Sequence, residues 1–193
     1  MPWRDRLASF RKRTTHRRDL FLVFLTNHVV ARVLFSAWRL WWYRHIMGFD
    51  IGPGASLLRD IRVSRRGNMR VGAHTVINNG CRLDNRFPIV IGKNVSLTYG
   101  TLVLTKGHDI DSPVFATKGA GVTIEDYAWI CANAIILPGV RVGRGGVVLP
   151  GGVVVKDVEP FHVVGGNPVK FIRERSRDLR YQLRWDPWVP FFG

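Results

Sequence analysis

The chain has 193 residues, of which 46% are hydrophobic and twenty are glycine. This length and composition predict one globular domain with short appendages and exclude a disordered chain. Two cysteines, Cys81 and Cys131, do not make a disulfide framework, and we interpret both as packing residues. The net charge of +15 is compatible with a nucleic-acid partner. The sequence carries no helix-turn-helix, zinc-finger or RNP signature, so we expect no nucleic-acid partner.

The positive charge is concentrated at the ends of the chain. Residues 1–48 hold ten Lys/Arg against two acidic residues, whereas residues 49–169 hold thirteen against nine. After a basic arm, polar residues recur at helical spacing on one stripe between Leu20 and Ile46, and apolar and aromatic residues surround them. This pattern predicts one amphipathic helical segment, whose stripe contains His28, Arg32, Ser36, Arg39 and Tyr43.

The wide aromatic surface of this segment has two interpretations, and the sequence leaves both open. The helix packs on its own domain or on a neighbouring subunit, or it lies on an anionic membrane with Trp and Arg at the headgroup level. No segment offers the roughly 20 apolar residues that a spanning helix needs, and no small-residue cleavage site follows the basic start. We therefore expect no transmembrane helix, no secretion and a cytoplasmic location, with peripheral contact at the inner membrane surface as the open question.

The body of the chain repeats every six residues. From Ile124 it divides into IEDYAW, ICANAI, ILPGVR, VGRGGV, VLPGGV and VVKDVE, and each unit opens with Ile or Val. The same frame appears upstream at Val71, Ile77, Ile91 and Leu97. A period of six is typical of a short strand followed by a turn, stacked as a triangular β-helix with about three units per coil. No coil buries its face alone, so several must stack.

The repeat breaks once, in KGHDIDSPVFATKGA, and an excursion from a regular solenoid is where function tends to lie. After the repeat ends, GGNPVKFIRER predicts a Gly/Pro turn leading into a short basic helix, which an aromatic tail follows. We therefore predict an all-β chain in three parts. These are a basic arm and amphipathic helical segment (1–48), a β-helix (49–160) with an excursion loop at 106–120, and a C-terminal turn, helix and tail (161–193).

The stretch from Val71 to Arg175 resembles the left-handed β-helix acetyltransferases of the hexapeptide-repeat type. The likeness is to the maltose and galactoside O-acetyltransferases and, through NHVVAR and WWYR in the helical segment, to exopolysaccharide-biosynthesis O-acetyltransferases. It implies a left-handed parallel β-helix and a homotrimer with active sites in clefts between subunits. It also implies acetyl-CoA as co-substrate along the coil edges, and direct transfer without an acyl-enzyme. The motifs that carry it are INNGCRLDNR (77–86), GHD (107–109), VTIEDYAWI (122–130), ILPGVRVGRG (136–145), VVKDV (154–158) and VVGGNPVKFIRE (163–174).

The resemblance also implies the site residues. His108 would be the general base, because a sugar hydroxyl is a poor nucleophile until its proton is removed and histidine titrates near neutrality. Asp109 or Asp111 would orient its ring. Where galactoside-type members carry an acidic acceptor ligand, this chain has Arg86. The acceptor ligands would be Asn78, Asp84 and Asn85, and the CoA-binding residues would be Trp129, Lys156, Lys170 and Arg173.

Three other functions were weighed. A related fold houses zinc carbonic anhydrases, but no two of the six histidines lie four or five residues apart, so we expect no metal. An N-acyltransferase acting on an amino sugar or another amine would keep the fold and change the acceptor. A non-catalytic β-helix that binds membranes would use only the basic ends. The sequence favours an O-acetyltransferase that moves an acetyl group to a hydroxyl of a sugar or polysaccharide precursor.

Overall fold

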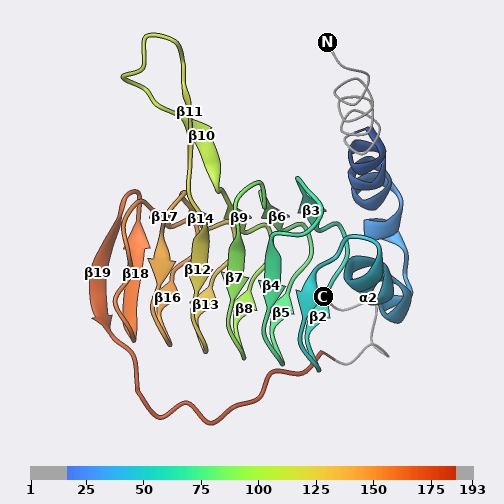
Figure 1. The fold of residues 1–193 in the computed structure, drawn as a ribbon. Helices are drawn as coiled ribbons and strands as arrows, with labels where there is room; N and C mark the ends of the chain where they lie inside the picture. The colour runs from blue at the N-terminus through green and yellow to red at the C-terminus, as the bar shows by residue number, and fades with distance from the viewer. Residues whose placement is uncertain (1–16, 186–193) are drawn as a thin grey trace.

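The computed structural model of the protein describes residues 17–185 and contains a parallel β-helix (Figure 1). Each coil contributes one short strand to each of three sheets. Sheet 1 contains β1 (Asp50–Ile51), β4 (Met69–Val71), β7 (Ile89–Ile91), β12 (Val122–Ile124) and β15 (Arg141–Val142). Sheet 2 contains β2 (Ser56–Leu57), β5 (Val76–Ile77), β8 (Ser96–Leu97), β13 (Trp129–Ile130), β16 (Val147–Val148), β18 (His162–Gly166) and β19 (Val169–Glu174). Sheet 3 contains β3 (Arg62–Val63), β6 (Arg82–Leu83), β9 (Leu102–Val103), β14 (Ile135–Ile136) and β17 (Val153–Val154).

The six-residue repeat sets the register of the coils. Ile77, Leu97 and Ile130 open their units in the sequence, and in sheet 2 they are successive Cα partners that point into the core. The small fifth residues, such as Ala128 and Ala134, are also fully buried. Between strands the chain turns at corners with positive φ, which Gly and Asn adopt more readily than other residues. The all-β solenoid that the repeat predicts is therefore confirmed.

A two-stranded hairpin interrupts the solenoid between β9 and β12. Strands β10 (Lys106–His108) and β11 (Thr117–Gly119) pair antiparallel, with His108 opposite Thr117. The hairpin projects away from the body of the β-helix (Figure 1). The sequence signal for it was the loss of the repeat, because a segment that leaves the stack no longer needs an inward aliphatic residue every six positions.

The prediction of a single helical segment over Leu20–Ile46 is wrong, because two helices with a break between them occupy this region. Residues 17–28 form the first helix, η1 (Val30–Arg32) is a 3-10 turn, and α2 (Ser36–His45) follows. At the break, Val33 and Phe35 have extended backbone angles. The polar stripe expected from His28 to Tyr43 therefore does not form, and Arg39 is buried instead, donating hydrogen bonds to the carbonyl oxygens of Val33, Leu34 and Leu57.

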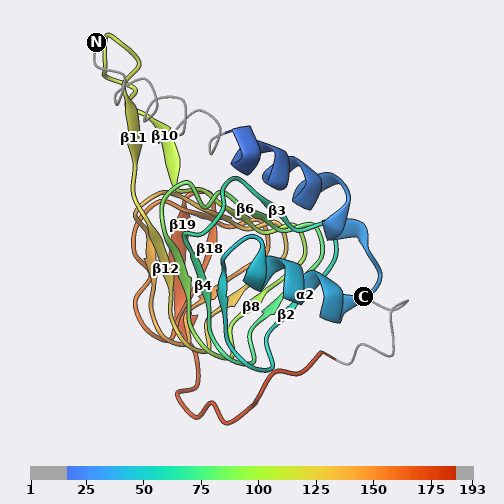
Figure 2. The same cartoon turned by 45° about the vertical axis from the view of Figure 1, so that its right-hand side comes forward.

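Docking on the first coil explains the break. The Asn27 side chain pairs with both backbone groups of Val63, at 2.8 and 3.0 Å, and the N–H of Asp60 donates to the carbonyl oxygen of Ala31. These bonds fix the first helix to β3 while α2 packs on β2, so the chain must turn between them. The two helices cover the end of the solenoid (Figure 2). Within residues 17–185 no helix combines the length and hydrophobicity that a bilayer span requires.

The prediction of a basic helix near the C-terminus is also wrong. Residues 169–174 form strand β19, which pairs antiparallel with β18 across a turn that contains a cis Asn167–Pro168 bond. The open edge of β18 offers backbone hydrogen bonds that a helix could not use. As a result, the exposed charges of Lys170 and Arg173 lie on the edge strand β19, where charge discourages the pairing of another strand. Residues 175–185 run back beneath the coils (Figures 1 and 2), and Arg175 donates to the carbonyl oxygen of Tyr127 at 3.1 Å.

Candidate active site

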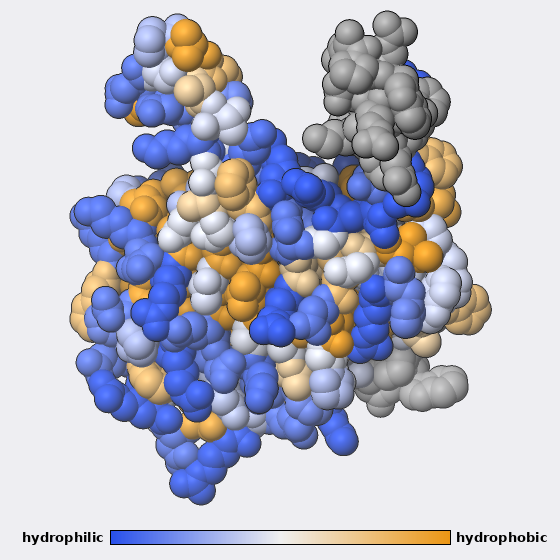
Figure 3. Space-filling model, viewed as in Figure 1, coloured by the Kyte–Doolittle hydropathy of each residue, from blue (hydrophilic) through white to orange (hydrophobic). Residues whose placement is uncertain are grey.

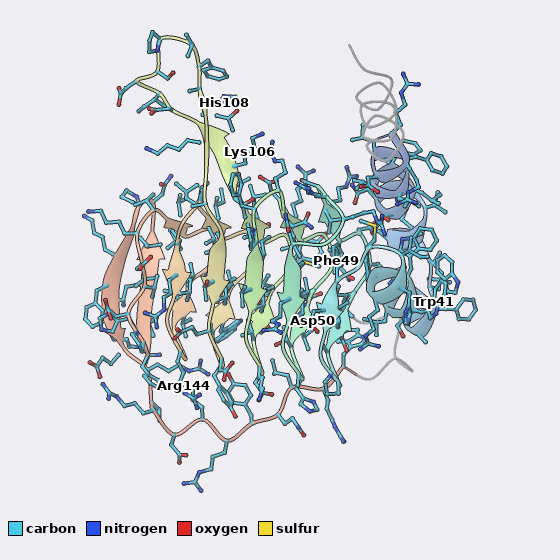
Figure 4. The ribbon with its side chains drawn as sticks, viewed as in Figure 1. Trp41, Phe49, Asp50, Lys106, His108 and Arg144 are labelled. Carbon is cyan, nitrogen blue, oxygen red and sulfur yellow. The ribbon has the colours of Figure 1, made fainter. Side chains whose placement is uncertain are left out.

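His108 lies on the hairpin, beyond Lys106 at its base (Figure 4). Its Nδ1 is 2.8 Å from the carbonyl oxygen of Phe115, and its ring stacks on the Phe115 ring with centroids 3.9 Å apart and planes 11° apart. A carbonyl oxygen only accepts hydrogen bonds, so in neutral imidazole Nδ1 carries the proton and Nε2 keeps its lone pair. The hairpin therefore holds an exposed histidine in the tautomer that a general base needs.

The orienting group is Phe115, not Asp109 or Asp111 as the sequence suggested. The Asp109 carboxylate accepts a hydrogen bond from the N–H of Asp111 at 3.1 Å. The backbone N–H of Asp109 donates to the carbonyl oxygen of Ala116. Sequence reasoning missed Phe115 because a backbone carbonyl has no residue signature. Its left-handed backbone, with φ of 52°, is uncommon for a bulky residue and gives the tip of the hairpin the turn that brings this carbonyl to the imidazole.

The base of the hairpin is built around Asp84, which is buried and accepts two hydrogen bonds from Arg86 at 2.6 and 2.8 Å. Burial works to raise the pKa of the Asp84 carboxyl. The hydrogen bonds and charge of Arg86, with the N–H of Thr105, outweigh burial and hold this pKa below its ordinary value. The Thr105 hydroxyl also donates to the carbonyl oxygen of Asp84. Asp84 thus positions Arg86 and joins β6 to the start of the hairpin, so it is not the free acceptor ligand that was expected.

Asn85 is structural, which corrects its expected role in acceptor binding. Its side chain is 0% exposed, its Oδ1 accepts the N–H groups of Ser64 and Arg65, and its Nδ2 donates to the carbonyl oxygens of Arg65 and Gly67. All four hydrogen-bonding positions of the amide are therefore used inside the chain. Asn78 differs, because it is half-buried and its Oδ1 accepts the neighbouring N–H of Asn79 at 2.7 Å, with no further side-chain hydrogen bond to the described residues.

The four residues expected to bind the cofactor lie on the outside of the solenoid, and none of them is on the hairpin. Trp129 is half-exposed on β13, and its indole N–H donates to the Thr98 hydroxyl at 3.0 Å. Lys156 is exposed just after β17, and Lys170 and Arg173 are exposed on β19. Among the described residues none of these three cations forms an ion pair, so their charge is available to an anionic ligand. Within one chain, no described contact joins any of the four to His108.

Among the described residues, neither thiol is activated and no cluster of metal-ligating side chains occurs. Burial raises the pKa of Cys81 to about 11 and also raises the pKa of Cys131, so little of either thiol is the nucleophilic thiolate near neutral pH. Among residues 17–185, no group of three or more His, Cys, Asp or Glu side chains is arranged to hold a metal ion. Neither thiol is therefore a candidate nucleophile, and the exposed imidazole of His108 is the candidate group for proton transfer on the hairpin.

Comparisons with known proteins give relatives of one kind, although no family model matches the chain. The structure is similar to a hexapeptide-repeat acetyltransferase from Vibrio cholerae O1 biovar eltor, solved with acetyl coenzyme A, at a TM-score of 0.71 and 29% identity over 79% of this chain and 82% of that one. A maltose O-acetyltransferase from Clostridium difficile 630 gives a TM-score of 0.72 and 29% identity over 81% and 83%. A chloramphenicol acetyltransferase from Klebsiella aerogenes is 37% identical over 75 residues, or 37% of this chain and 36% of its own.

The two kinds of similarity differ in extent. The chain spans about a third of the length of the first curated relatives it matches, whereas the solved structures align over about four fifths of both chains. The long alignment includes the coils, which are where the six-residue repeat was found. The six-residue repeat predicts this solenoid, and the solenoid matches hexapeptide-repeat acetyltransferases over about four fifths of its length. The chain therefore has the left-handed parallel β-helix fold of these proteins and is similar to them, a maltose O-acetyltransferase included.

Proposed function

We propose that the protein transfers an acetyl group from acetyl-CoA to a hydroxyl of a sugar or polysaccharide precursor, with His108 as general base and no acyl-enzyme. The observation that carries this proposal is the hydrogen bond from His108 Nδ1 to the Phe115 carbonyl, which leaves Nε2 free to accept a proton. The similarity to a maltose O-acetyltransferase, and to an enzyme solved with acetyl coenzyme A, supports the acceptor and donor classes.

In the proposed reaction, His108 Nε2 takes the proton of the acceptor hydroxyl as the oxygen attacks the thioester carbonyl. A backbone N–H stabilises the negative charge that develops on that carbonyl oxygen. The C–S bond then breaks, and the imidazolium returns its proton to the departing thiolate, which leaves CoA and the acetyl ester. Every proton is accounted for by one histidine, so the step needs neither a metal nor a covalent enzyme intermediate.

The exposed cations are suited to the phosphates of CoA. Lys156, Lys170 and Arg173 are exposed and form no ion pair among the described residues, and phosphate oxygens accept charge-assisted hydrogen bonds from such groups. Trp129 offers a half-exposed ring whose N–H is already bound to Thr98, so an apolar face remains for contact along the cofactor cleft. We propose these four residues as the acetyl-CoA site.

Within one chain His108 contacts none of these cations among the described residues, which favours a homotrimer in which each site lies between subunits. The hairpin projects from its own body and carries apolar side chains at its tip, with Ile110 94% exposed and Val114 and Phe115 also exposed. Burial of such side chains against a neighbouring subunit would be favourable. An active monomer in light scattering combined with activity measurements would contradict the trimer.

We also propose that the protein is cytoplasmic and contacts the inner membrane surface through its N-terminal helices. Apolar side chains gather along the edge of the molecule that these helices form (Figure 3), and Trp41 points away from the body (Figure 4). Arginines accompany them, which suits anionic headgroups. The side chains of this aromatic patch are exposed, and they are Leu20, Phe21, Phe24, Val29, Leu34, Phe35, Trp38 and Trp41.

The test of the catalytic proposal is thiol release from acetyl-CoA across a panel of neutral sugars and amino sugars. His108→Ala should lose turnover by about 10²–10⁴-fold, the usual contribution of a positioned base, while CoA binding persists. His28→Ala is the control, because His28 is also exposed and also contacts a phenylalanine ring, that of Phe24, with centroids 4.6 Å apart and planes tilted by 34°. Equal turnover in wild type and His108→Ala would remove His108 from the role. Preference for amines would replace O-transfer with N-transfer.

A further inference from the structure

A groove of about 330 Å³ lies between the first helix and the base of the His108 hairpin. Strands β3 and β6 lie between these two elements in both ribbon views (Figures 1 and 2). We call this the arginine groove. Its walls carry Arg62, Arg82 and Arg86, its first-helix side carries Asn27, and Leu102 and Leu104 also line it.

We infer that the arginine groove binds a phosphate group of the acceptor, so that the acceptor is a phosphorylated or diphosphate-linked saccharide. The inference rests on the proposed function only for the position of transfer, at His108. The binding of phosphate by the groove is a separate property that can be measured without any turnover.

The first argument is an uncompensated pair of like charges. Arg62 and Arg82 are Cα partners on the parallel strands β3 and β6, and both side chains are exposed. Like charges directly opposite one another on neighbouring strands are destabilising. Among the described residues neither guanidinium forms an ion pair or a hydrogen bond. A bound dianion between them would convert this repulsion into attraction.

The contrast with sheet 1 shows that the chain compensates other strand arginines. Arg70 on β4 lies opposite Asp50 on β1 and donates to its carboxylate at 2.7 Å. Arg141 on β15 donates to Glu125 at 2.8 Å. Arg62 and Arg82 lack such partners within residues 17–185, so the arginine groove is a site of unneutralised charge and not the general pattern of this solenoid.

The one acidic side chain in the groove does not neutralise this pair. The Asp84 carboxylate accepts hydrogen bonds from Nε and Nη2 of Arg86 and from the N–H of Thr105. Arg86 is thereby fixed as a planar donor at the wall of the groove, where its remaining N–H groups can bind a phosphate oxygen. Three guanidinium groups therefore face one carboxylate that is already occupied.

The groove lies within reach of His108. Leu104, which lines it, precedes His108 by four residues, and an extended chain spans at most about 3.3 Å per residue, or about 13 Å in all. A short saccharide with its phosphate among the arginines could therefore present a hydroxyl to Nε2 of His108. The half-buried Leu102 and Leu104 offer an apolar surface for the sugar ring between the two points.

The first experiment measures binding of inorganic pyrophosphate by titration calorimetry, at fixed ionic strength and with saturating CoA, which occupies the other proposed phosphate site. The double variant Arg62→Gln/Arg82→Gln should bind pyrophosphate at least about tenfold more weakly, the cost of one lost charge-assisted hydrogen bond. Arg70→Gln is the control, because it removes an exposed strand arginine from another sheet. Wild-type binding by the double variant would overturn the inference.

The second experiment compares transfer to a hexose, to its 1-phosphate, and to a prenyl-diphosphate-linked sugar in vesicles. The double variant should raise KM for the phosphorylated acceptors and leave their kcat and the unphosphorylated sugar unchanged. Preference between the two phosphorylated forms tells a soluble from a lipid-linked acceptor. If no acceptor is acetylated but pyrophosphate binding still depends on Arg62 and Arg82, the proposed function fails and the phosphate site remains. Equal KM for phosphorylated and plain sugars would overturn the site's role in acceptor binding.

Discussion

The ring of Phe115 lies against the imidazole of His108 while the carbonyl of the same residue accepts its Nδ1–H. One residue thus fixes both the plane and the tautomer of the proposed base. Phe115→Gly keeps the left-handed backbone that Phe115 adopts and removes only the ring. We expect kcat to fall by about tenfold to a hundredfold, because a misplaced base loses much of its contribution, with KM for acetyl-CoA unchanged.

The matched control for this prediction is Val114→Gly, which adds similar backbone freedom next to Phe115 and removes a different exposed side chain from the tip of the hairpin. Steady-state kinetics and a pH profile of kcat/KM should be measured for both variants. If Val114→Gly lowers kcat as much as Phe115→Gly does, loop freedom and not the stacked ring sets the position of His108.

Asn78 and Asn85 should separate into a binding residue and a structural one. Asn85→Ala removes a fully buried amide and four hydrogen bonds to the backbone, so we expect a loss of about 2–3 kcal/mol in the free energy of unfolding. Asn78→Ala should change stability by no more than about 1 kcal/mol and raise KM for the acceptor. Urea unfolding and acceptor kinetics check both. A stable Asn85→Ala protein would contradict this assignment.

The Asp84–Arg86 pair predicts a pH-dependent contribution to stability. Because the pKa of Asp84 is lowered in the folded protein, the unfolded chain binds the proton more tightly. The contribution is therefore complete well above the unfolded value of about 3.9 and is lost as pH falls through the lower folded value. Asp84→Asn should cost about 1–3 kcal/mol at pH 7. Urea unfolding should be measured from pH 7 downward. The difference in free energy of unfolding between wild type and variant should become smaller only in the acid range. If the difference in free energy of unfolding does not depend on pH, the Asp84–Arg86 ion pair is not its cause.

The fold was more predictable from sequence than the details of the site. Ile77, Leu97 and Ile130 recur at a fixed position of the repeat, and a solenoid requires that period, so sheet, register and core followed from it. The break between the two N-terminal helices did not follow, because it depends on Asn27 meeting Val63 and on Arg39 being buried, and both are tertiary contacts. Asn78 and Asn85 are the same residue type seven positions apart, so only the structure distinguishes the half-buried amide of Asn78 from the fully hydrogen-bonded amide of Asn85.

The C-terminal strand and Phe115 were missed for a related reason. Val169–Glu174 has no strong strand alternation, and it becomes a strand because β18 presents an open edge beside it. The carbonyl of Phe115 acts through the backbone, so residue identity gives no sign of it. The position of His108 was predictable because the interruption of the repeat marks the hairpin.

The cations proposed for CoA should affect donor binding and not chemistry. Lys170→Ala/Arg173→Ala removes two exposed charges from the edge strand β19, and we expect KM for acetyl-CoA to rise by about tenfold or more with kcat little changed. Arg180→Ala is a suitable control, because Arg180 is exposed and pairs with Asp178 outside the coils. Initial rates at varied acetyl-CoA concentration give the answer. A fall in kcat without a change in KM would place these charges at the reacting atoms instead.

The aromatic patch should bind anionic lipid, and the contribution of its apolar side chains can be measured separately from that of the nearby arginines. Phe24→Ser/Trp41→Ser removes two exposed apolar side chains on two helices, each worth about 1.5–3 kcal/mol when fully buried. We expect flotation with vesicles of phosphatidylethanolamine and phosphatidylglycerol to fall at least about tenfold for this variant. Phe171→Ser/Ile172→Ser removes exposed apolar side chains at the opposite end of the solenoid and should float like wild type. Binding that survives in phosphatidylcholine vesicles would show that the arginines contribute little. If wild type does not float with anionic vesicles but the patch variant changes the oligomeric state, the patch is a contact between copies of this chain.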